Sequence, residues 1–348
     1  MVKIVCLMPL FNHVDSLRRS VQSVLKQIGN FDLKLVILDD CSTDGSYELA
    51  LELQKTFPSQ IIVHKNDHNV GLLLSIYNGY NYLIGSDYFC VLDPDDWYTD
   101  DKKLSTAVTF LESHKDYSLY MNNVLVKKGK EEDVMVKTTL DYADFSYEDL
   151  KAGKFAPFVQ TSGVVYRNCY FKDKFNDDFK KIFNYSFSES FRADSFRFYW
   201  YLKNGRAYFN NKTCSIYNYD SEGIWARLDF VSQIITNAKL FFAMSEFFTD
   251  KEFYEKQSLL KLMTLQKNKC SLDTITYKEK AELKKLLLLL DIHKKNIVLR
   301  EITSLYILIC KILSKLLFGN IRVLFKDYIT QMRNNNKLAI YMRSIFTK

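Results

Sequence analysis

Short apolar segments alternate with helical segments along the first 92 residues, and this alternation is the feature that most restricts the fold. The apolar segments are rich in branched and aromatic residues, as buried strands are, and they cover residues 3–8, 33–38, 61–64 and 88–92. Segments with helical spacing or helix-start residues lie between them, over 14–27, 42–57 and 71–83. Strand–helix repeats of roughly 30 residues predict an α/β fold, with a mostly parallel sheet and helices on both of its faces.

Acidic residues follow two of these predicted strands. Asp39 and Asp40 follow the second strand, and Asp93, Asp95 and Asp96 follow the fourth. Proline has no N–H for a strand ladder and favours an extended residue before it, so the Pro at 94 should turn the chain out of the sheet. Ligands of such sheets gather beyond the carboxyl ends of the strands. We therefore expect these acids to meet at one edge of the sheet.

Three carboxylates within four residues repel one another unless a cation lies among them. Mg²⁺ and Mn²⁺ take oxygen ligands and usually complete their coordination with the phosphates of a substrate. The run at 93–96 therefore predicts a site for one of these two ions. The alternative is a solvated acidic turn in front of the helix that begins near Asp100, because Asp is common in such turns.

Composition excludes several other classes of protein. The 348 residues are 47% hydrophobic and include only 11 Gly and 4 Pro, so the chain is neither disordered nor fibrous. Seven cysteines stand singly without a CxxC pair, which favours reduced thiols in a cytosolic protein over disulfides or a zinc site. We expect no signal peptide and no membrane-spanning helix, because the first ten residues have a strand pattern and the longest uncharged run is polar.

Positive charge is concentrated near the C-terminus. Residues 302–348 hold eight basic residues and one acid, whereas residues 1–301 hold 40 of each, so the formal net charge of +7 belongs to the last segment. The composition becomes rich in Leu, Ile, Phe and Lys after residue 227. This change predicts one domain over 1–227 and an α-helical region over 228–348, with helices near 230–248, 278–290 and 297–317.

The basic residues of this last segment recur at intervals of four and seven, which places them on one stripe of a helix. A basic amphipathic helix can lie on an anionic membrane surface. The alternative is a helical extension that packs on the first domain or on a second copy of the chain, with its lysines in solvent.

Four motifs occur in sequence within the first 100 residues. They are Met-Pro-Leu-Phe-Asn at 8–12, Ile-Leu-Asp-Asp-Cys-Ser-Thr-Asp-Gly-Ser at 37–46, Asn-Val-Gly at 69–71 and Val-Leu-Asp-Pro-Asp-Asp-Trp at 91–97. Together they resemble the successive motifs of the family 2 glycosyltransferases. The resemblance covers roughly the first 110 residues and continues more loosely to Arg227. It implies the GT-A fold, a Rossmann-like domain, here with a C-terminal helical extension.

The resemblance also implies roles for residues at the edge of the sheet. In that family Pro9 and Phe11 would lie along the base and ribose of a nucleotide, and Asp39 or Asp40 would accept a hydrogen bond from the uracil ring or the ribose. A carboxylate suits that task because it is an acceptor only when ionised. The residues implied to bind the nucleotide are Pro9, Phe11, Asn12, Asp39, Asp40 and Asp93.

The same resemblance assigns the acidic run to a metal ion. Asp93-Pro94-Asp95 stands at the family's DxD motif, with Asp95 as a direct ligand of Mn²⁺ or Mg²⁺ and Asp93 on the metal or the ribose. One departure concerns the motif that begins at Gly71, where Ile76 and Tyr77 stand in place of the family's usual arginine and asparagine. Lys65 and Arg192 are the candidates to replace that arginine.

A general base is implied near the start of a later helix. The family places an acid there, and its spacing from Gly205 points to Asp194, with Glu189 as the alternative. Inverting transfer needs one carboxylate to take the proton from the acceptor hydroxyl. An acid favoured by the helix dipole explains either residue without catalysis.

These observations favour a metal-dependent, inverting glycosyltransferase in bacterial surface polysaccharide or capsule synthesis. The expected donor is a nucleotide-diphosphate sugar, with UDP as the carrier, and the expected acceptor is a glycan or a lipid-linked glycan. We expect a cytoplasmic enzyme that touches the inner face of the membrane through 302–348 or forms a homo-oligomer. One alternative is a nucleotidyltransferase of sugar phosphates, but the Gly-rich phosphate loop that such an enzyme needs after its first strand is missing from this sequence. The other is a nucleic-acid-binding protein that uses the basic tail, but residues 1–301 carry no net charge, which argues against it.

Overall fold

The computed structural model describes residues 1–168, 176–187, 190–219, 223, 225–267 and 276–293. Its contacts divide the chain into two compact units. One contains residues 1–229 and 239–254, and the other contains 230–238 and the described residues from 255 onward. The basic stripe of 302–348 and the helix predicted near 297–317 lie outside the described residues.

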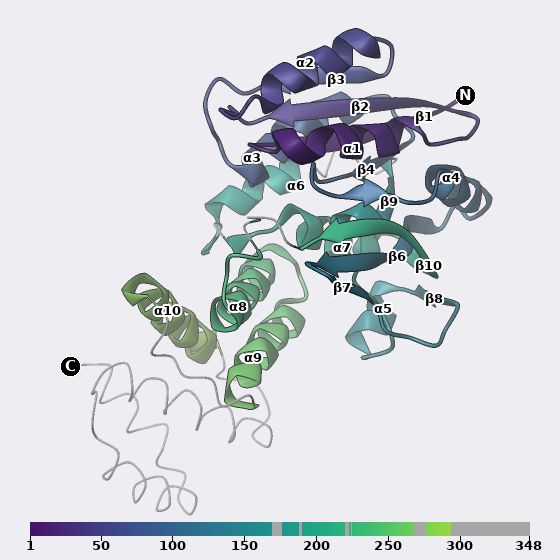
Figure 1. The fold of residues 1–348 in the computed structure, drawn as a ribbon. Helices are drawn as coiled ribbons and strands as arrows, with labels where there is room; N and C mark the ends of the chain where they lie inside the picture. Colours follow the sequence, from purple (N-terminus) through teal and green to yellow (C-terminus); the bar gives the residue numbers. More distant parts are fainter. Residues whose placement is uncertain (169–175, 188–189, 220–222, 224, 268–275, 294–348) are drawn as a thin grey trace, which may run out of the picture. The chain divides into compact units, whose positions relative to one another are not determined.

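The first unit is built on one mixed sheet (Figure 1). Its strands are β1 (Val2–Leu10), β2 (Phe31–Asp39), β3 (Ile61–Lys65), β4 (Tyr88–Val91), β5 (Trp97–Tyr98), β6 (Tyr117–Lys128), β7 (Glu131–Val134), β8 (Tyr142–Phe145), β9 (Val164–Arg167) and β10 (Arg206–Asn218). They run in the order β3-β2-β1-β4-β9-β6-β10-β5, while β7 pairs with β6 and β8 pairs with β10.

The helices follow the strands in alternation over the first third of the chain. The α-helices are α1 (Val14–Leu25), α2 (Ser46–Thr56), α3 (Leu72–Gly79), α4 (Lys103–Ser113), α5 (Tyr147–Lys151), α6 (Asn176–Lys181), α7 (Ala193–Asn204), α8 (Phe230–Phe247), α9 (Lys251–Lys267) and α10 (Tyr277–His293). Short 3₁₀ segments are η1 (Tyr80–Leu83), η2 (Thr161–Gly163) and η5 (Ile182–Asn184).

Strands β1 to β4 pair in parallel, as the sequence predicts, and the second half of the sheet is mixed. β1 pairs in parallel with both β2 and β4, and β2 with β3. β9 runs antiparallel between β4 and β6, whereas β6 and β10 are parallel to each other. The four predicted strands and the three helices between them are all present, and the predicted α/β fold is confirmed.

Both faces of the sheet are buried, which explains why the first strands read as continuous apolar runs. On β1, Ile4, Cys6 and Met8 face one hydrophobic core and Val5 and Leu7 face the other. Helices α1, α2 and α4 supply apolar side chains to the first core, and α3 and α7 supply the second. The sheet is therefore packed tightly between two layers of helices, and the loops that follow the carboxyl ends of its strands start from fixed positions.

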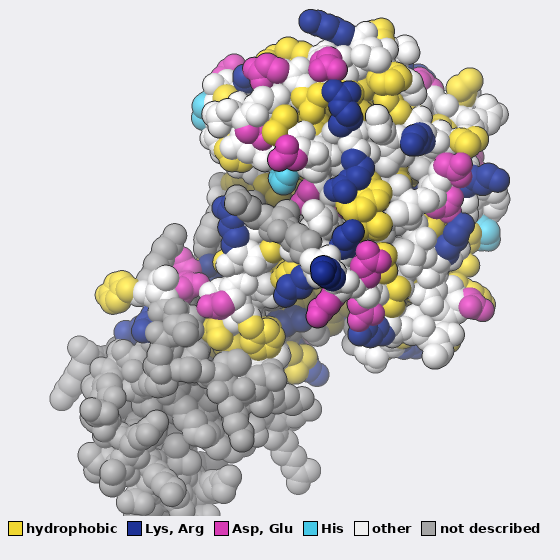
Figure 2. Space-filling model, in the orientation of Figure 1, with side chains coloured by type: hydrophobic (Ala, Val, Ile, Leu, Met, Phe, Trp, Pro, Cys, Tyr) yellow, Lys and Arg dark blue, Asp and Glu magenta, His cyan; other side chains and the backbone are white. Residues whose placement is uncertain are grey.

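The outer surface carries charges of both signs. On the face shown in Figure 2, acidic and basic side chains of the described residues are intermingled rather than gathered by sign. This mixture agrees with the equal numbers of acids and bases in residues 1–301. Among the helices whose residues are described, none is both long and apolar enough to cross a membrane.

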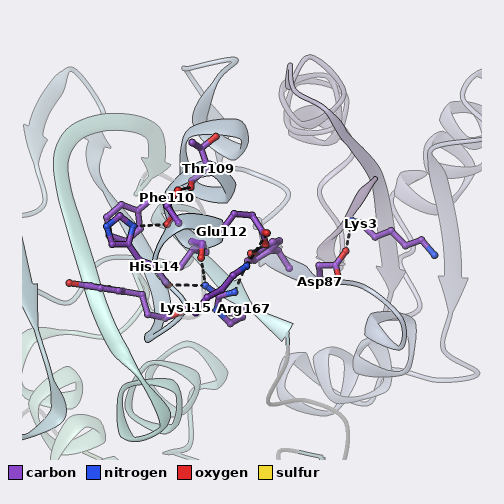
Figure 3. Close-up of polar contacts among 12 residues, drawn as sticks. Lys3, Asp87, Thr109, Phe110, Glu112, His114, Lys115 and Arg167 are labelled. Carbon is purple, nitrogen blue, oxygen red and sulfur yellow. Dashed lines mark hydrogen bonds and ion pairs between the residues drawn. The ribbon is translucent and has the colours of Figure 1, made fainter.

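One buried arginine, Arg167, fastens β9 to the segment that connects α4 and β6. Arg167, at the end of β9, donates from Nε to the Tyr117 carbonyl (2.9 Å) and from Nη2 to the carbonyls of Leu111 and His114, the latter at 3.0 Å (Figure 3). Its Nη1 lies 3.2 Å from the Tyr88 hydroxyl on β4. The guanidinium thereby adds hydrogen bonds to carbonyls at and just after the C-terminal end of α4, where Leu111 also accepts the His114 N–H and His114 the Tyr117 N–H.

Candidate active site

The acidic segments predicted to converge do lie on one edge of the sheet. β1 is the neighbour of both β2 and β4, so the segments that leave these three strands are adjacent. The Asp40 N–H donates to the Leu10 carbonyl (2.8 Å), and the Leu92 N–H donates to the Leu7 carbonyl (3.0 Å). The strand order thus places Pro9, Asp39–Asp40 and the acidic loop 93–96 along a common rim.

The loops after β1 and β2 are fastened to each other. Asn12 adopts a left-handed conformation (φ 57°), which a short polar side chain tolerates better than most. Its N–H donates to the Ser42 hydroxyl (3.1 Å), and its Oδ1 accepts from the Thr43 N–H (2.8 Å). Phe11, next to it, remains 46% exposed. Asn12 therefore supports the rim through its amide, and the Phe11 ring is available to a ligand.

The two acids after β2 have different partners. Asp40 is buried, and its carboxylate accepts from the N–H groups of Val70 (2.9 Å) and Gly71 (2.8 Å) and from Asn66 Nδ2 (2.9 Å). It therefore holds the loop between β3 and α3. Asp39 is fully buried as well, and among the described residues its carboxylate accepts one N–H, that of Ser42, which lies 3.3 Å from each of its oxygens. Asp39 keeps more capacity to accept a hydrogen bond from a ligand.

The acidic loop 93–96 is held by its backbone. The Ser20 hydroxyl on α1 lies within hydrogen-bond distance of the Pro94 carbonyl (2.7 Å) and of the Asp96 carbonyl. The Arg19 guanidinium stacks 3.5 Å from the centre of the Trp97 ring and donates to the Asp95 carbonyl (3.3 Å). These contacts fix the loop without using the carboxylates of Asp93 and Asp95.

Negative charge in this loop exceeds what the surrounding groups compensate. Burial, followed by the charges of Asp95 and Asp194, raises the pKa of Asp93 to about 7, against the opposing charge of Arg197 and a hydrogen bond from Gln160. Burial and the charges of Asp93 and Asp95 hold the pKa of Asp96 well above its usual range. Asp96 accepts the Asn218 N–H at 2.9 Å through Oδ1, and its buried Oδ2 has no partner within the described chain.

The predicted general base belongs to this site. Asp194 lies in the first turn of α7, and its Oδ1 accepts the N–H (2.6 Å) and hydroxyl (3.2 Å) of Ser195. Its charge raises the pKa of Asp93, and also those of Tyr80 and Tyr166, which are raised chiefly by burial. Asp194 is thus electrostatically coupled to the acidic loop, although 101 positions separate it from Asp93. Glu189, the alternative base, lies outside the described residues.

A buried arginine stands behind these acids, and the sequence reasoning did not single it out. Arg197, three residues after Asp194 on α7, is 1% exposed. Its Nη1 donates to the Tyr80 hydroxyl (3.1 Å), and its guanidinium carbon lies 5.6 Å from the Tyr166 ring centre. Its charge lowers the pKa of Asp93 against the stronger effect of burial. The cation therefore offsets part of the negative charge of the site from within the core.

The candidates for the missing family arginine are engaged elsewhere. Ile76, on α3, is buried in the second core, and Tyr77 stacks on Phe179 with ring centres 5.6 Å apart. Lys65 places its ammonium 3.9 Å from the centre of the Tyr47 ring, and Arg192 places its guanidinium 4.4 Å from a Trp225 ring. Neither contact favours one of them as the replacement.

The acidic loop suits a cation that is shared with a bound phosphate. Among the described residues, no three His, Cys, Asp or Glu side chains form a group that could hold a metal by themselves. The Asp95 carboxylate accepts no hydrogen bond from the described residues, and Asp93 accepts one, from Gln160. Mg²⁺ sites typically use one or two carboxylates and take their other ligands from water and substrate phosphates. Asp93 and Asp95 fit such a site, whereas a closed protein cage does not fit.

In a comparison with protein families, residues 5–200 match the family described as Glycosyl transferase family 2. Among curated proteins, the chain is 29% identical over 124 residues to a protein named as glycosyltransferase EpsE from Bacillus subtilis, covering 36% of this chain and 44% of that one. It is 27% identical over 132 residues to the processive diacylglycerol beta-glycosyltransferase of Mycoplasma pneumoniae, covering 38% of each. The matches span less than half the length of these relatives.

Solved structures with the same fold are more distant in sequence. Residues 1–349 of S. aureus TarS, in complex with UDP-GlcNAc, share 14% identity with this chain at a TM-score of 0.59, covering 83% of this chain and 80% of that one. GalNAc-T7, with UDP, GalNAc and Mn²⁺, shares 13% identity at a TM-score of 0.50, covering 83% of this chain and 54% of that one. These likenesses establish the GT-A fold.

Proposed function

The chain belongs to glycosyl transferase family 2, and from that premise we propose that it moves a sugar from a nucleotide-diphosphate donor, a UDP-sugar, to a hydroxyl group of a glycan or lipid-linked glycan. The observation that carries the proposal is the charge arrangement at the rim. Three carboxylates of one loop, with Asp194 coupled to them, leave negative charge uncompensated where the β1 and β2 loops also end. A cation and the diphosphate of a donor would complete that arrangement.

Asp95 and Asp93 are the residues that we propose to hold a divalent cation, Mn²⁺ or Mg²⁺. A bound cation of this kind neutralises charge that develops on a departing diphosphate. The chain prepares the site beforehand, because Ser20 and Arg19 fix the backbone of the loop while the Asp95 carboxylate has no hydrogen bond from the described residues. Preorganised groups of this kind spend no reorganisation energy at the moment of reaction.

Asp194 is the residue that we propose as general base. In an inverting transfer, the acceptor oxygen forms a bond to the anomeric carbon while the bond from that carbon to the diphosphate oxygen breaks, and the bonding pair leaves with the diphosphate. The acceptor proton passes to the Asp194 carboxylate. The position of Asp194 in the first turn of α7 supports the assignment, because the Ser195 N–H and hydroxyl hold one carboxylate oxygen and leave the other for the proton.

The nucleoside would lie at the loops after β1 and β2. Phe11 offers an exposed ring beside Pro9, and Asp39 keeps acceptor capacity that Asp40 has committed to the loop before α3. We therefore favour Asp39 over Asp40 for the contact with the uracil or the ribose. Asn12 would act indirectly in that case, by holding the two loops together.

A proposal about the pathway rests on the names of two similar proteins. The names of the Mycoplasma relative and of the TarS complex refer to diacylglycerol and to UDP-GlcNAc respectively. We propose a bacterial cell-surface glycan as the product, with the reaction at the cytoplasmic side of the membrane. Membrane contact through 302–348 and self-association remain proposals of the same kind.

The direct test incubates purified protein with a panel of nucleotide sugars and Mn²⁺ or Mg²⁺, and measures release of the nucleotide diphosphate. Asp95→Ala should lose metal-dependent donor binding, whereas Asp194→Asn should bind the donor and fail in transfer. Thermal stabilisation by UDP plus Mn²⁺, but not by DNA, separates the proposal from a nucleic-acid-binding function, because a ligand of the native state raises its stability. Normal transfer by Asp194→Asn would overturn the choice of base.

A further inference from the structure

We propose that Gln160 is a positioning residue of the transfer reaction, which holds the Asp93 carboxylate in the orientation in which it can join Asp95 on a cation. The inference rests on the proposed function, because it concerns the same site. Gln160 immediately precedes η2, 67 positions from Asp93, and its Nε2 donates to Asp93 Oδ2 at 3.0 Å. No sequence motif marks it.

The amide of Gln160 is fixed in one orientation by a second residue. Its Oε1 accepts from both the N–H (2.6 Å) and the hydroxyl (2.7 Å) of Ser162. A backbone N–H can only donate, so the oxygen of the amide must face Ser162 and the NH₂ group must face Asp93. The donor aimed at Asp93 is therefore set by geometry, and it does not depend on how the amide is assigned.

The orientation is transmitted from the core of the sheet. The Ser162 hydroxyl lies 3.1 Å from the Ser215 hydroxyl, both fully buried, and Ser215 is on β10. Gln160 itself is 9% exposed. The chain of contacts runs from β10 through η2 to the acidic loop after β4, so it joins two parts of the sheet that the strand order separates.

The hydrogen bond from Gln160 also determines which oxygen of Asp93 is left for a ligand. Asp93 accepts one hydrogen bond on Oδ2 and keeps Oδ1 without one from the described residues, which directs the second oxygen toward a ligand. Groups that hydrogen-bond to metal-ligating side chains orient them, and their loss typically weakens metal binding or activity by about 10- to 100-fold. Gln160 stands in that relation to Asp93.

The test uses Gln160→Met, which has a similar length and no donor, and compares it with a matched control. Asn168→Leu removes another buried amide, which follows β9 rather than preceding it and donates to the carbonyls of Leu83 and Ser86. The readouts are the Mn²⁺ concentration at half-maximal rate, kcat at saturating Mn²⁺ and donor, the melting temperature, and binding of Mn²⁺ in the presence of UDP by electron paramagnetic resonance.

We expect Gln160→Met to need about 10-fold more Mn²⁺ or higher, with a smaller loss of kcat once Mn²⁺ is saturating, and to bind Mn²⁺ with UDP correspondingly more weakly. Asn168→Leu should melt at a lower temperature and keep the wild-type Mn²⁺ requirement. If Gln160→Met does not fold, Gln160→Asn carries the same expectation, because its amide is one methylene too short to reach both Ser162 and Asp93.

A Mn²⁺ requirement within threefold of wild type in the folded Gln160 variant would overturn the inference, as would an equal change in Asn168→Leu. Failure of the proposed function looks different. In that case the wild-type protein itself would show no binding of Mn²⁺ with UDP and no turnover of any nucleotide sugar.

Discussion

Replacing Asp93 by asparagine should make the metal-free protein more stable at neutral and alkaline pH. Asparagine has the same shape and can still accept the hydrogen bond from Gln160, so the substitution removes little besides the charge. Burial and the charges of Asp95 and Asp194 raise the pKa of Asp93 to about 7, from an ordinary value of 3.8. The ionised carboxylate is therefore less favourable in the folded chain than in the unfolded chain.

The sign and the pH window follow from those two values. Below about pH 4 the carboxyl group is protonated in both states and its charge costs the fold nothing. Between about pH 4 and pH 7 the unfolded chain ionises while the folded chain resists, so wild-type stability falls as the pH rises. One pKa unit corresponds to about 1.36 kcal/mol, so the full difference is about 4 kcal/mol. Asp93 is partly exposed, and we expect about 2–4 kcal/mol.

Urea unfolding in EDTA measures this difference directly. At pH 8, Asp93→Asn should exceed wild type by about 2–4 kcal/mol in the free energy of unfolding, and at pH 4.5 by about 1 kcal/mol or less. Asp67→Asn, an exposed acid with no hydrogen bond among the described contacts, serves as the control and should show no such pH dependence. Equal differences at both pH values, or a less stable Asp93→Asn at pH 8, would refute the electrostatic reasoning.

Three further substitutions test how the fold is held together, Asp40 at the rim and the other two away from it. Asp40→Ala should lower the free energy of unfolding by about 2–4 kcal/mol, because it leaves the N–H groups of Val70 and Gly71 and the amide of the same loop without their acceptor; urea unfolding measures it. Arg167→Met should cost about 3–5 kcal/mol, since it removes the several hydrogen bonds by which a buried guanidinium ties β9 to the segment between α4 and β6, and kcat per folded molecule should stay at the wild-type value. Ser146→Ala, which removes the capping box of α5, should cost about 1 kcal/mol by the same assay, and an effect near zero would contradict the role of the cap.

The first third of the chain could be predicted because its signals are local. Apolar runs and helical spacing within 92 residues determine β1 to β4 and the helices between them, and parallel pairing then brings their carboxyl ends together. The adjacency of Asp39–Asp40 and the loop 93–96 followed from that rule alone. The resemblance to family 2 and the GT-A fold is confirmed by the family match and by the solved structures.

The support of the site could not be predicted in the same way, because it comes from remote parts of the chain. Gln160 reaches Asp93 only because β9 inserts antiparallel between β4 and β6, and Arg197 lies behind the acids only because α7 packs on the second core. Asp40 is a residue whose role the sequence suggested and the structure does not favour. Its sequence suggests a ligand contact, yet three N–H donors of a loop about 30 positions later occupy its carboxylate.

Some predictions stay predictions. Glu189 and the basic stripe of 302–348 lie outside the described residues. The domain boundary at 227 lies close to the point where the first unit's main segment ends, but α8 and α9 each contribute residues to both units.

The central claim is that carboxylates at one edge of the sheet hold a cation and, through it, the diphosphate of a sugar donor. A crystal of the protein grown with UDP and Mn²⁺ tests it most directly, because the anomalous signal of manganese locates the ion without reference to activity. The account predicts the ion in direct contact with an Asp95 oxygen and with the diphosphate, and Asp194 on the same rim. An ion bound elsewhere, or UDP bound away from the loops of Phe11 and Asp95, would contradict it.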